Sequence, residues 1–459
     1  MVLARLLTPA ELGVYSVAMA LLAMASTLRD MGAGNYLLQE KDLTADRIRA
    51  VWAVQLGLGV LLGLVVALLS GPAARFYDEP AIREIMLLLA LNYLINPFGS
   101  LTYAWLMREM RYDAIATMRF TSTLSGAAVS LILAWHGHGA ISLAWGSLCG
   151  TLVNAGVSIF YRPDGYPWIP GVKDLKRVLS FGARLTGTSI LTSLSAAAPE
   201  FLLGKTQGMA ATGFYSRANG LVALFNRLVT DAVYTVALSM FSQQARNGQN
   251  YAEPFMRAIA YLTALSWSFT VGLVLLAHPT MLLLYGEQWL VAVPLTRWLA
   301  SAAAVSVSIP LCTAALVGAG QLARMLRATL ITTLATISAA AAGAAFGLQV
   351  LGMSMLLASV ISIAAWHHIT RQHVGFTWAA LIRCSLHSAI VAVTTGIGPL
   401  IAVLIYGWQP HSVLAPLSLG ISLGVVGFFA SVLIFNHPLA DEIRRVIALL
   451  MTRLRTQER

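Results

Sequence analysis

Long apolar stretches alternate with short polar joints along almost the whole chain. Each stretch runs for about 20 residues or more, the length that an α-helix needs to cross the hydrocarbon core of a bilayer. A membrane β-barrel would instead alternate apolar and polar residues over about ten positions. The pattern predicts an all-α, polytopic membrane protein with about thirteen transmembrane helices, at residues 12–37, 50–72, 82–107, 114–135, 140–161, 179–203, 213–241, 255–284, 290–318, 325–347, 350–370, 380–407 and 412–435.

Composition agrees with this pattern. Of the 459 residues, 58% are hydrophobic and 11% are charged, against roughly 25% charged residues in a soluble domain. The chain therefore cannot bury its apolar side chains in a globular core. The longest joint, Arg162 to Arg177, contains three prolines near the middle of the sequence and is interpreted as a linker between two halves.

Basic residues are distributed unevenly over the joints. Taken alternately, one set of joints holds only Arg5, Arg75, Arg83 and Lys205. The other set holds twenty: Lys41, Arg47, Arg49, Arg108, Arg111, Arg162, Lys173, Lys176, Arg177, Arg246, Arg257, Arg324, Arg327, Arg371, Arg383, Arg444, Arg445, Arg453, Arg455 and Arg459. Short basic loops stay in the cytoplasm, so this bias predicts a cytoplasmic C-terminus. The net charge of +11 is then an orientation signal and not a nucleic-acid footprint.

A short motif occurs twice, as LGVYS at Leu12–Ser16 and TGFYS at Thr212–Ser216. Aligning the two copies also pairs Asp30 with Asp231, YDE at 77–79 with YGE at 285–287, and Pro97 with Pro310. The common order of these matches predicts an internal repeat, which is typical of transporters with a central pathway between two lobes. The Gly-x-Tyr-Ser motif is interpreted as the outer joint between the first two helices of each lobe.

The alignment gives the second copy a full helix before the motif, whereas in the first copy the chain begins only a few residues before Arg5, the basic residue that matches Lys205. We therefore expect that a first helix is missing, through a start codon placed too late or a truncated product. A genuine thirteen-span protein is the alternative.

Several blocks together carry a family resemblance: LARLLTPAELGVYSVA, DMGAGNYLLQEKDLT, ARFYDEPAI, MREMRYD, FGARLTGTSIL, GFYSRANGL and YGEQWLVAVPLTRWLA. From Val2 to about Trp408 the chain resembles the bacterial polysaccharide exporters of the multidrug, oligosaccharidyl-lipid and polysaccharide superfamily. It departs from their pattern in lacking the first helix, and in having AAAPEFLLG where an Asn/Asp-rich segment is usual.

The resemblance implies a two-lobed fold of fourteen helices, like that of multidrug and toxic-compound extrusion (MATE) proteins. It implies an inner-membrane flippase that moves an undecaprenyl-diphosphate-linked oligosaccharide to the outer leaflet. The partners that it implies are membrane lipids and the polymerase and chain-length proteins of the same pathway. The expected organisation is an N-terminal lobe at 1–161, a cytoplasmic linker at 162–178, a C-terminal lobe at 179–372, two extra helices at 373–436 and a basic cytoplasmic tail at 437–459.

A diphosphate headgroup needs cationic side chains that are held away from lipid, and the planar guanidinium of arginine binds phosphate in a bidentate manner. An intramembrane charge is costly unless it faces a partner or a wet cavity. Apart from the twenty-four basic residues counted above with the joints and their flanks, six lie within the predicted spans, and all are arginine: Arg29, Arg119, Arg184, Arg217, Arg227 and Arg297.

Each arginine also has a structural interpretation. Arg29 adjoins Asp30, Arg227 lies one turn before Asp231, and Arg184 can extend to the membrane interface. The other three have no adjacent carboxylate in the sequence. Arg119, Arg217 and Arg297 are therefore the preferred diphosphate ligands, followed by Arg227 and Arg29.

Glu200 follows Pro199 near the predicted outer end of a helix. Its carboxylate could take a proton or sodium ion that drives alternating access, or pair with an arginine of the other lobe. Asp231 and Asp30 have the same two interpretations, ion coupling or a structural pair. We expect no metal site and no organic cofactor, because the histidines and cysteines match no strong ligand spacing.

Three functions compete. A multidrug cation exporter of the same fold would need acidic residues in its cavity, and two of the three intramembrane carboxylates lie beside arginines. A glycan polymerase or ligase would be expected to have a large external loop with catalytic residues, and the joints leave no room for one. The sequence favours the flippase, a transporter and not an enzyme.

Overall fold

The computed structural model describes residues 2–30, 36–37, 40, 44–163, 167, 169–173, 175–225, 229–410 and 412–445, without the side chains at 28–30, 176–177, 179–186 and 225. These residues are almost entirely helical and contain no β-strand. Contacts divide the chain into two compact units, Met1–Ser216 and Arg217–Arg459. The predicted lobe boundaries were drawn from the repeat and the resemblance, and they stay a prediction.

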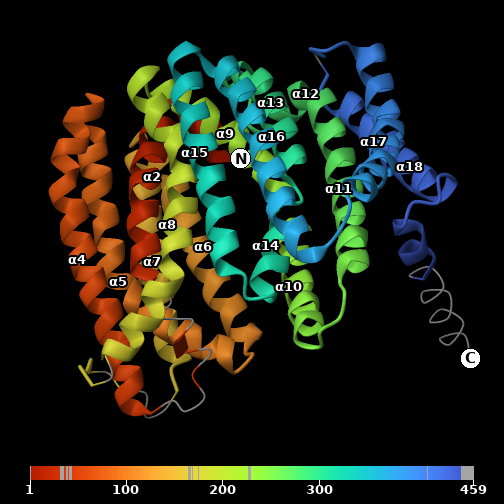
Figure 1. Cartoon of the computed structure of the whole chain (residues 1–459). Coiled ribbons are helices and arrows are strands. Elements are labelled where there is room, and N and C mark those ends of the chain that lie inside the picture. Colours follow the sequence, from red (N-terminus) through yellow and green to blue (C-terminus); the bar gives the residue numbers. More distant parts are fainter. Residues whose placement is uncertain are drawn as a thin grey trace, which may run out of the picture. The chain divides into compact units, whose positions relative to one another are not determined.

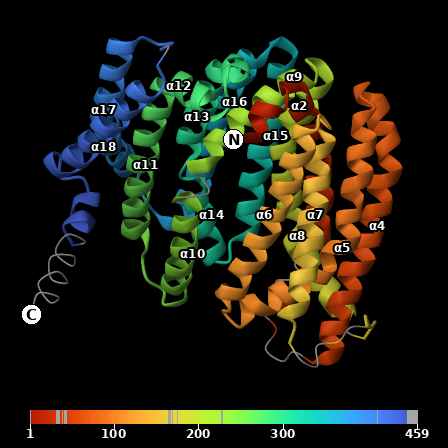
Figure 2. The ribbon, with the colours of Figure 1, turned by 180° about the vertical axis from the view of Figure 1, so that it is seen from behind.

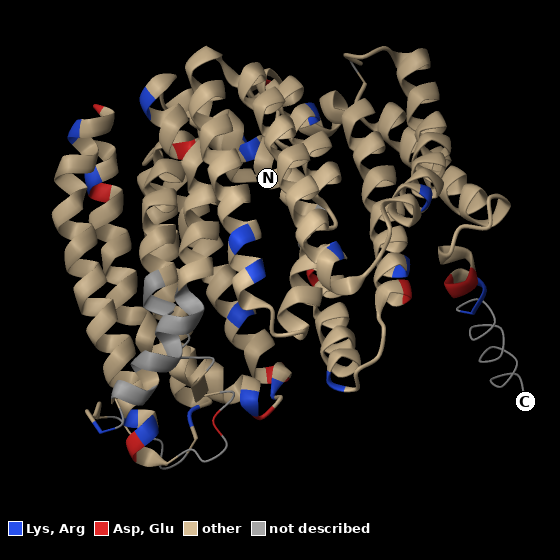
Figure 3. Cartoon of the chain, in the orientation of Figure 1, with Lys and Arg blue, Asp and Glu red and all other residues tan. Residues whose placement is uncertain are grey.

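Ten helices in the described part of the chain are long and apolar enough to cross a membrane. Along α4 (Ala45–Tyr77) and α5 (Ala81–Arg108), charged residues occur near both ends and the long middle has none (Figure 3). The 33 residues of α4 extend about 50 Å at 1.5 Å per residue, more than the thickness of the hydrocarbon core. The protein is therefore a multi-pass membrane protein, while the count of thirteen spans stays a prediction.

Unit 1 is a bundle in which α4 packs on α5, α5 and α6 pack on α7, and α2 packs on α8 (Figure 1). Its core includes Val17 and Leu22 of α2 together with Ile82, Ile85 and Leu89 of α5. The remaining elements of unit 1 are α1 (Val2–Leu6), α2 (Pro9–Asp30), α6 (Tyr112–Trp135), α7 (Ile141–Phe160), α8 (Leu175–Thr206) and the first residues of α9 (Met209–Phe225).

Unit 2 is a second bundle, in which α17 packs on α18 and α11, and α13 packs on α16 (Figure 2). Its largest core cluster includes Phe241, Phe255, Leu311 and Trp366. Besides the rest of α9, unit 2 contains α10 (Asp231–Arg246), α11 (Ala252–Leu275), α12 (Ala277–Leu284), the 3₁₀ helix η2 (Glu287–Ala292), α13 (Val293–Ser306), α14 (Ile309–Gly318), α15 (Leu322–Phe346), α16 (Leu348–Val374), α17 (Trp378–Tyr406) and α18 (Leu414–Ile434).

In the described part of unit 2, two spans that the sequence predicts as single helices are broken, and the predicted span 213–241 corresponds to α9 and α10, with residues 226–228 outside the described part. The 255–284 span divides at Leu276 into α11 and α12, and the 290–318 span consists of η2, α13 and α14. Pro279 and Pro310 follow these breaks, and proline cannot donate the backbone hydrogen bond that would continue a helix across them. Proline does not always break a helix here, since α5 continues through Pro97 and α8 through Pro199.

The two Gly-x-Tyr-Ser motifs lie within helices, which corrects their interpretation as joints. The joints come just before them, at residues 7–8 and 207–208. In the first copy, the Thr8 amide donates to Glu11 Oε2 at 2.8 Å and the Glu11 amide donates to Thr8 Oγ1 at 3.3 Å. This reciprocal cap starts α2 at Pro9, so the motif occupies the first turns of the helix.

The two copies of the motif pack against each other inside unit 1. A Cβ on Gly13 would lie 1.7 Å from the carbonyl oxygen of Met209, and a Cβ on Gly213 would lie 1.9 Å from that of Pro9. Ser16 Oγ donates to Ser216 Oγ at 2.8 Å. Ser16 and Ser216 are equivalent positions of the repeat, and the repeat converts the contact of Gly13 with Met209 into that of Gly213 with Pro9. This motif therefore holds glycine because the backbones of α2 and α9 touch there.

Gly13→Ala is expected to destabilise the protein by about 3 kcal/mol, because an added methyl group must push two backbones apart. Thermal unfolding of the purified protein in detergent measures this as a lower Tm. The matched control is Gly220→Ala on α9, where a Cβ would meet nothing within 4 Å and the better helix propensity of alanine should leave Tm unchanged or higher. Equal Tm values for the two variants would contradict the close crossing.

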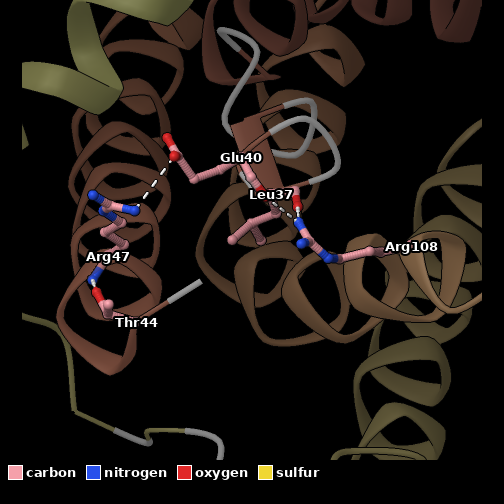
Figure 4. A network of polar contacts seen from close by, with 5 residues as sticks. All are labelled: Leu37, Glu40, Thr44, Arg47 and Arg108. Carbon is pink, nitrogen blue, oxygen red and sulfur yellow. Dashed lines mark hydrogen bonds and ion pairs between the residues drawn. The ribbon is translucent and has the colours of Figure 1, made fainter. Parts of the chain in front are cut away.

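A polar network joins Leu37 and Glu40 to the start of α4 and the end of α5 (Figure 4). Arg108 Nη1, at the end of α5, donates to the carbonyl oxygens of Leu37 and Glu40 at 2.7 and 2.5 Å. The Glu40 carboxylate pairs with Arg47 at 3.3 Å, and Thr44 caps α4 by accepting from the Arg47 amide. These basic residues of the predicted cytoplasmic side therefore have structural partners.

A buried histidine joins the segment after α18 to α11 and α17. His437 is 1% exposed. Its Nδ1 accepts from the Leu439 amide at 3.2 Å, so Nε2 carries the proton and donates to Ser388 Oγ at 3.3 Å. Thr263 also donates to Ser388 Oγ, at 2.8 Å. Burial, with the nearby charge of His387 second, lowers the pKa of His437 from 6.5 to about 4.

This low pKa predicts a loss of stability in acid. Below about pH 6.5 the unfolded chain binds a proton that the folded chain excludes, so the stabilisation is complete above that pH and is lost as the pH falls toward about 4. The loss is on the order of 2–3 kcal/mol. We expect His437→Asn, whose Oδ1 keeps the acceptor for Leu439, to flatten the decrease of Tm with pH, and His136→Asn at an exposed position to leave it unchanged. The same slope in both variants would refute this assignment.

Candidate functional site

Unit 2 contains an apolar groove of about 580 Å³ between α9, α11, α12, α17 and α18. Aliphatic and aromatic side chains form most of its wall, including Leu221, Leu224, Leu273, Ile421 and Phe428. Among the described residues that line it, three have polar side chains, Ser268, Thr280 and Thr395, and none is charged. The described wall of the groove can therefore hold a hydrocarbon chain.

Small residues create this groove. A Cβ on Gly398 would lie 2.5 Å from the Gly424 amide nitrogen, so α17 and α18 touch through their backbones. Pro399 and Gly420 line the groove beside this contact. Gly272 of α11 faces open space, since a Cβ there would meet nothing within 4 Å. A larger side chain at Gly272 would therefore enter the groove without disturbing the helix packing.

Arg297 of α13 lies near one end of the groove. Its Nε donates to the carbonyl oxygen of Val274 at 3.0 Å, and Val274 follows the groove residue Leu273 in the last turn of α11. The guanidinium carbon lies 4.9 Å from the ring centroid of Trp408, in the loop between α17 and α18. One arginine thus joins α13, α11 and the α17–α18 loop beside the groove. Trp408 itself remains 52% exposed.

His278 adds a buried polar atom to this region. It is the second residue of α12, is 9% exposed, and interacts electrostatically with Arg297. Within the described part of the chain, its Nδ1 has no hydrogen-bond partner. The same short helix contributes Thr280 and Leu284 to the groove. A buried nitrogen that lacks a partner beside a cation is unusual in a purely structural site.

Arg217 of α9 lies near the other end of α12. Its guanidinium carbon is 5.9 Å from the ring centroid of Tyr285, the residue that follows α12. Burial raises the pKa of Tyr285, and the charge of Arg217 partly opposes this. Because α12 has eight residues, its ends are about 12 Å apart. The structure therefore brings the predicted residues Arg217 and Arg297 to the two ends of one short helix.

Arg119, the third preferred arginine, lies on α6 in unit 1. Its side chain is exposed, donates from Nη2 to the Tyr103 hydroxyl, and stacks on that ring with 5.3 Å between the guanidinium carbon and the ring centroid. The hydroxyls of Thr117, Thr121 and Ser122 donate to backbone carbonyl oxygens of α6 itself. Tyr103 positions the exposed arginine, and the role of Arg119 stays a prediction.

Several predicted residues lie outside the part of the chain that the structure describes. The side chains of Arg29, Asp30 and Arg184, and all of Arg227, lie outside it. Glu200 is half-buried in α8 and acts electrostatically on the buried Tyr215. Asp231 is exposed at the first position of α10. Ion coupling by Glu200, Asp231 or Asp30 therefore remains untested.

Sequence reasoning did not identify His278, Trp408 or Tyr285. Tyr285 and Trp408 lie in predicted joints and His278 lies inside the predicted span 255–284, and only the fold places them beside the two arginines. Trp408 had one signal, its position in a polar joint between two long apolar runs.

The sequence model of a family described as polysaccharide biosynthesis protein matches residues 2–294. The chain is 26% identical over 383 residues to the succinoglycan biosynthesis transport protein ExoT of Rhizobium meliloti (strain 1021), covering 82% of this chain and 74% of that protein. It is 23% identical over 309 residues to the lipopolysaccharide biosynthesis protein WzxC of Escherichia coli (strain K12), covering 65% of this chain and 61% of that protein.

Two solved structures share the fold. The lipid II flippase MurJ in an inward closed conformation matches with a TM-score of 0.76 at 13% identity, over 95% of this chain and 94% of that chain. An inward-facing multidrug resistance transporter of the MATE family matches with a TM-score of 0.64 at 15% identity, over 83% and 93%. These likenesses confirm the predicted MATE-like fold.

Proposed function

The chain belongs to the polysaccharide biosynthesis protein family, and from this premise we propose that it is a flippase for an undecaprenyl-diphosphate-linked oligosaccharide. The relatives named above include a transport protein of succinoglycan biosynthesis, and the MurJ structure is that of a lipid II flippase. The proposed substrate joins a long hydrocarbon tail, a diphosphate and sugars in one molecule. The protein is accordingly a transporter and not an enzyme.

The observation that carries this proposal is that Arg297 lies near one end of an apolar groove. The groove suits the polyprenyl tail, because its wall is almost wholly apolar and burial of hydrocarbon is favourable. Arg297 and the unpartnered nitrogen of His278 suit the diphosphate, and the exposed ring of Trp408 suits the face of a sugar. One amphiphilic ligand satisfies all three.

A multidrug cation exporter is the alternative within the same fold. A cationic drug would require carboxylates along its path, and the described residues that line the groove include none. The cations near α12 would repel such a substrate. A glycan polymerase or ligase receives no support from the relatives named above, which include a transport protein, or from the transporter fold.

The proposed location is the bacterial inner membrane, with the C-terminus in the cytoplasm, as the bias of basic residues predicts. In this orientation α12 and Trp408 lie toward the outer side. Transport proceeds by alternating access of the two repeats, and Glu200 is the proposed carrier of a coupling proton or sodium ion. The polymerase and chain-length proteins of the pathway are proposed to receive the product.

Accumulation of the lipid-linked oligosaccharide in a deletion strain tests the proposal. The amount in each leaflet is measured with a membrane-impermeant oxidant of sugars. Loss of a flippase leaves the intermediate inaccessible on the cytoplasmic leaflet, and adding back the chain removes it. Accumulation of an accessible intermediate would indicate a polymerase or ligase, whereas normal levels together with drug sensitivity would indicate a multidrug exporter.

A further inference from the structure

The turn between α4 and α5 in unit 1 forms a crevice of about 700 Å³ that the proposed transport function does not use. Its wall contains two basic residues, Arg75 and Arg83, and two acidic residues, Asp78 and Glu79. Leu68 and Gly71 complete it on the α4 side. Charges of both signs therefore meet at the end of two long apolar helices.

The turn is held in a fixed shape by α8. Asp78 adopts a left-handed conformation with φ of 56° and ends α4. Lys205 of α8 donates to the carbonyl oxygen of Phe76, pairs with Asp78 at 3.6 Å, and lies 4.9 Å from the Phe76 ring centroid. Tyr77 donates from its hydroxyl to the Phe201 carbonyl oxygen at 3.3 Å. Since Lys205 neutralises Asp78, the remaining charges of the crevice are two positive and one negative.

These remaining charged side chains have no ion-pair or hydrogen-bond partner in the described part of the chain. In the described part of the chain, the side chains of Arg75, Arg83 and Glu79 form no ion pair and no hydrogen bond with one another or with other residues. Pro72 cannot donate to the carbonyl of Leu68, which lies in the wall of the crevice. The crevice thus offers donors for an anion and acceptors for a cation.

Exposed leucines lead away from the crevice along both helices. The exposed fractions of Leu64, Leu68 and Leu69 on α4 are 58%, 76% and 53%, and those of Leu87 and Leu91 on α5 are 40% and 42%. In a membrane protein such side chains contact acyl chains. A ligand that fits the whole site has a charged headgroup at the crevice and hydrocarbon along α4 and α5.

We propose that this crevice binds a zwitterionic phospholipid whose headgroup carries a primary ammonium, such as phosphatidylethanolamine. Its phosphate meets Arg75 and Arg83, while its ammonium donates to Glu79 and to the Leu68 carbonyl. Phosphatidylcholine has the same charges but no N–H donors, and phosphatidylglycerol lacks the cation, so both bind more weakly. The site is separate from the transport groove and does not depend on the proposed function.

Glycines on α4 supply a matched pair of variants. A Cβ would meet nothing within 4 Å at either Gly71 or Gly57, but only Gly71 lines the crevice. Gly71→Leu therefore fills the crevice, and Gly57→Leu makes the same change on the same helix outside it. Glu79→Gln removes the partner of the ammonium and leaves both arginines in place.

The test is native mass spectrometry of the purified full chain titrated with each of the three phospholipids. We expect phosphatidylethanolamine to bind wild type and Gly57→Leu about tenfold more tightly than phosphatidylcholine, the effect of one charge-assisted hydrogen bond from the ammonium. Gly71→Leu should lose this binding, and Glu79→Gln should bind the two lipids equally. Equal binding of the three lipids by wild type, or equal binding by Gly71→Leu and Gly57→Leu, would overturn the proposal.

Discussion

Replacing Gly272 by leucine is expected to lower transport at least about thirtyfold without lowering the amount of folded protein. The added side chain projects into the groove, because nothing lies within 4 Å of a Cβ at this position, and there it takes the space of the substrate's tail. Loss of about 2 kcal/mol of apolar burial between the tail and the groove corresponds to this decrease in the transport rate. The measurement is the appearance of lipid-linked oligosaccharide on the outer leaflet, per molecule of folded protein.

The matched control is Gly156→Leu on α7, another helical glycine with open space around its Cβ. Both substitutions replace glycine in a helix interior and should raise helix stability by up to about 1 kcal/mol. Only Gly272→Leu blocks the groove, so Gly156→Leu should transport at the wild-type rate. If Gly272→Leu transports normally, the tail takes another route, although the chain would still be a flippase by the accumulation test.

Much of the fold could be predicted from the sequence because membrane helices are specified locally. A continuous apolar run must become a helix in a bilayer, where every backbone polar group has to be satisfied within the segment, and each predicted span contains a described helix. The breaks inside two spans could not be predicted. Proline marks the breaks near Pro279 and Pro310, but α5 and α8 remain continuous through Pro97 and Pro199.

The repeat was the most informative long-range signal. Matching Gly13 with Gly213 and Ser16 with Ser216 identified positions that the structure places in contact. The sequence alone does not show why the motif contains glycine, because glycine serves both at turns between helices and where two backbones approach closely. The interpretation as a joint was wrong because the Thr8 and Glu11 cap starts α2 before the motif.

The candidate site was only partly predictable for a similar reason. An arginine within an apolar run is conspicuous, so Arg217 and Arg297 could be singled out from composition alone. Their neighbours depend on which helices meet. The groove itself has no sequence signature, since its leucines and glycines resemble those of any lipid-facing or packed surface.

Arg297→Ala is expected to reduce transport about thirtyfold or more, through loss of a charge-assisted contact worth about 2 kcal/mol with the diphosphate. Arg297→Lys should recover only part of this, because an ammonium keeps the charge but cannot bind phosphate in a bidentate manner or stack on Trp408 as a planar group. Arg217→Ala and Arg119→Ala test the other two predicted ligands in the same assay. Arg257→Ala, which removes an exposed pair with Glu253, is the control and should transport normally.

A structural role of Arg297 must be separated from a role in substrate binding, since its bond to Val274 also joins α13 to α11. Loss of that bond would lower Tm and the amount of folded protein, whereas loss of a ligand raises the substrate concentration needed for half-maximal transport. Trp408→Leu separates the two effects, because it removes the stacked ring and leaves the bond to Val274 in place. We expect Arg297→Ala to raise that concentration strongly at nearly constant Tm, and Trp408→Leu to raise it less. A fall in Tm that accounts for the whole loss of transport would make Arg297 a structural residue and leave the anion to Arg217 and Arg119.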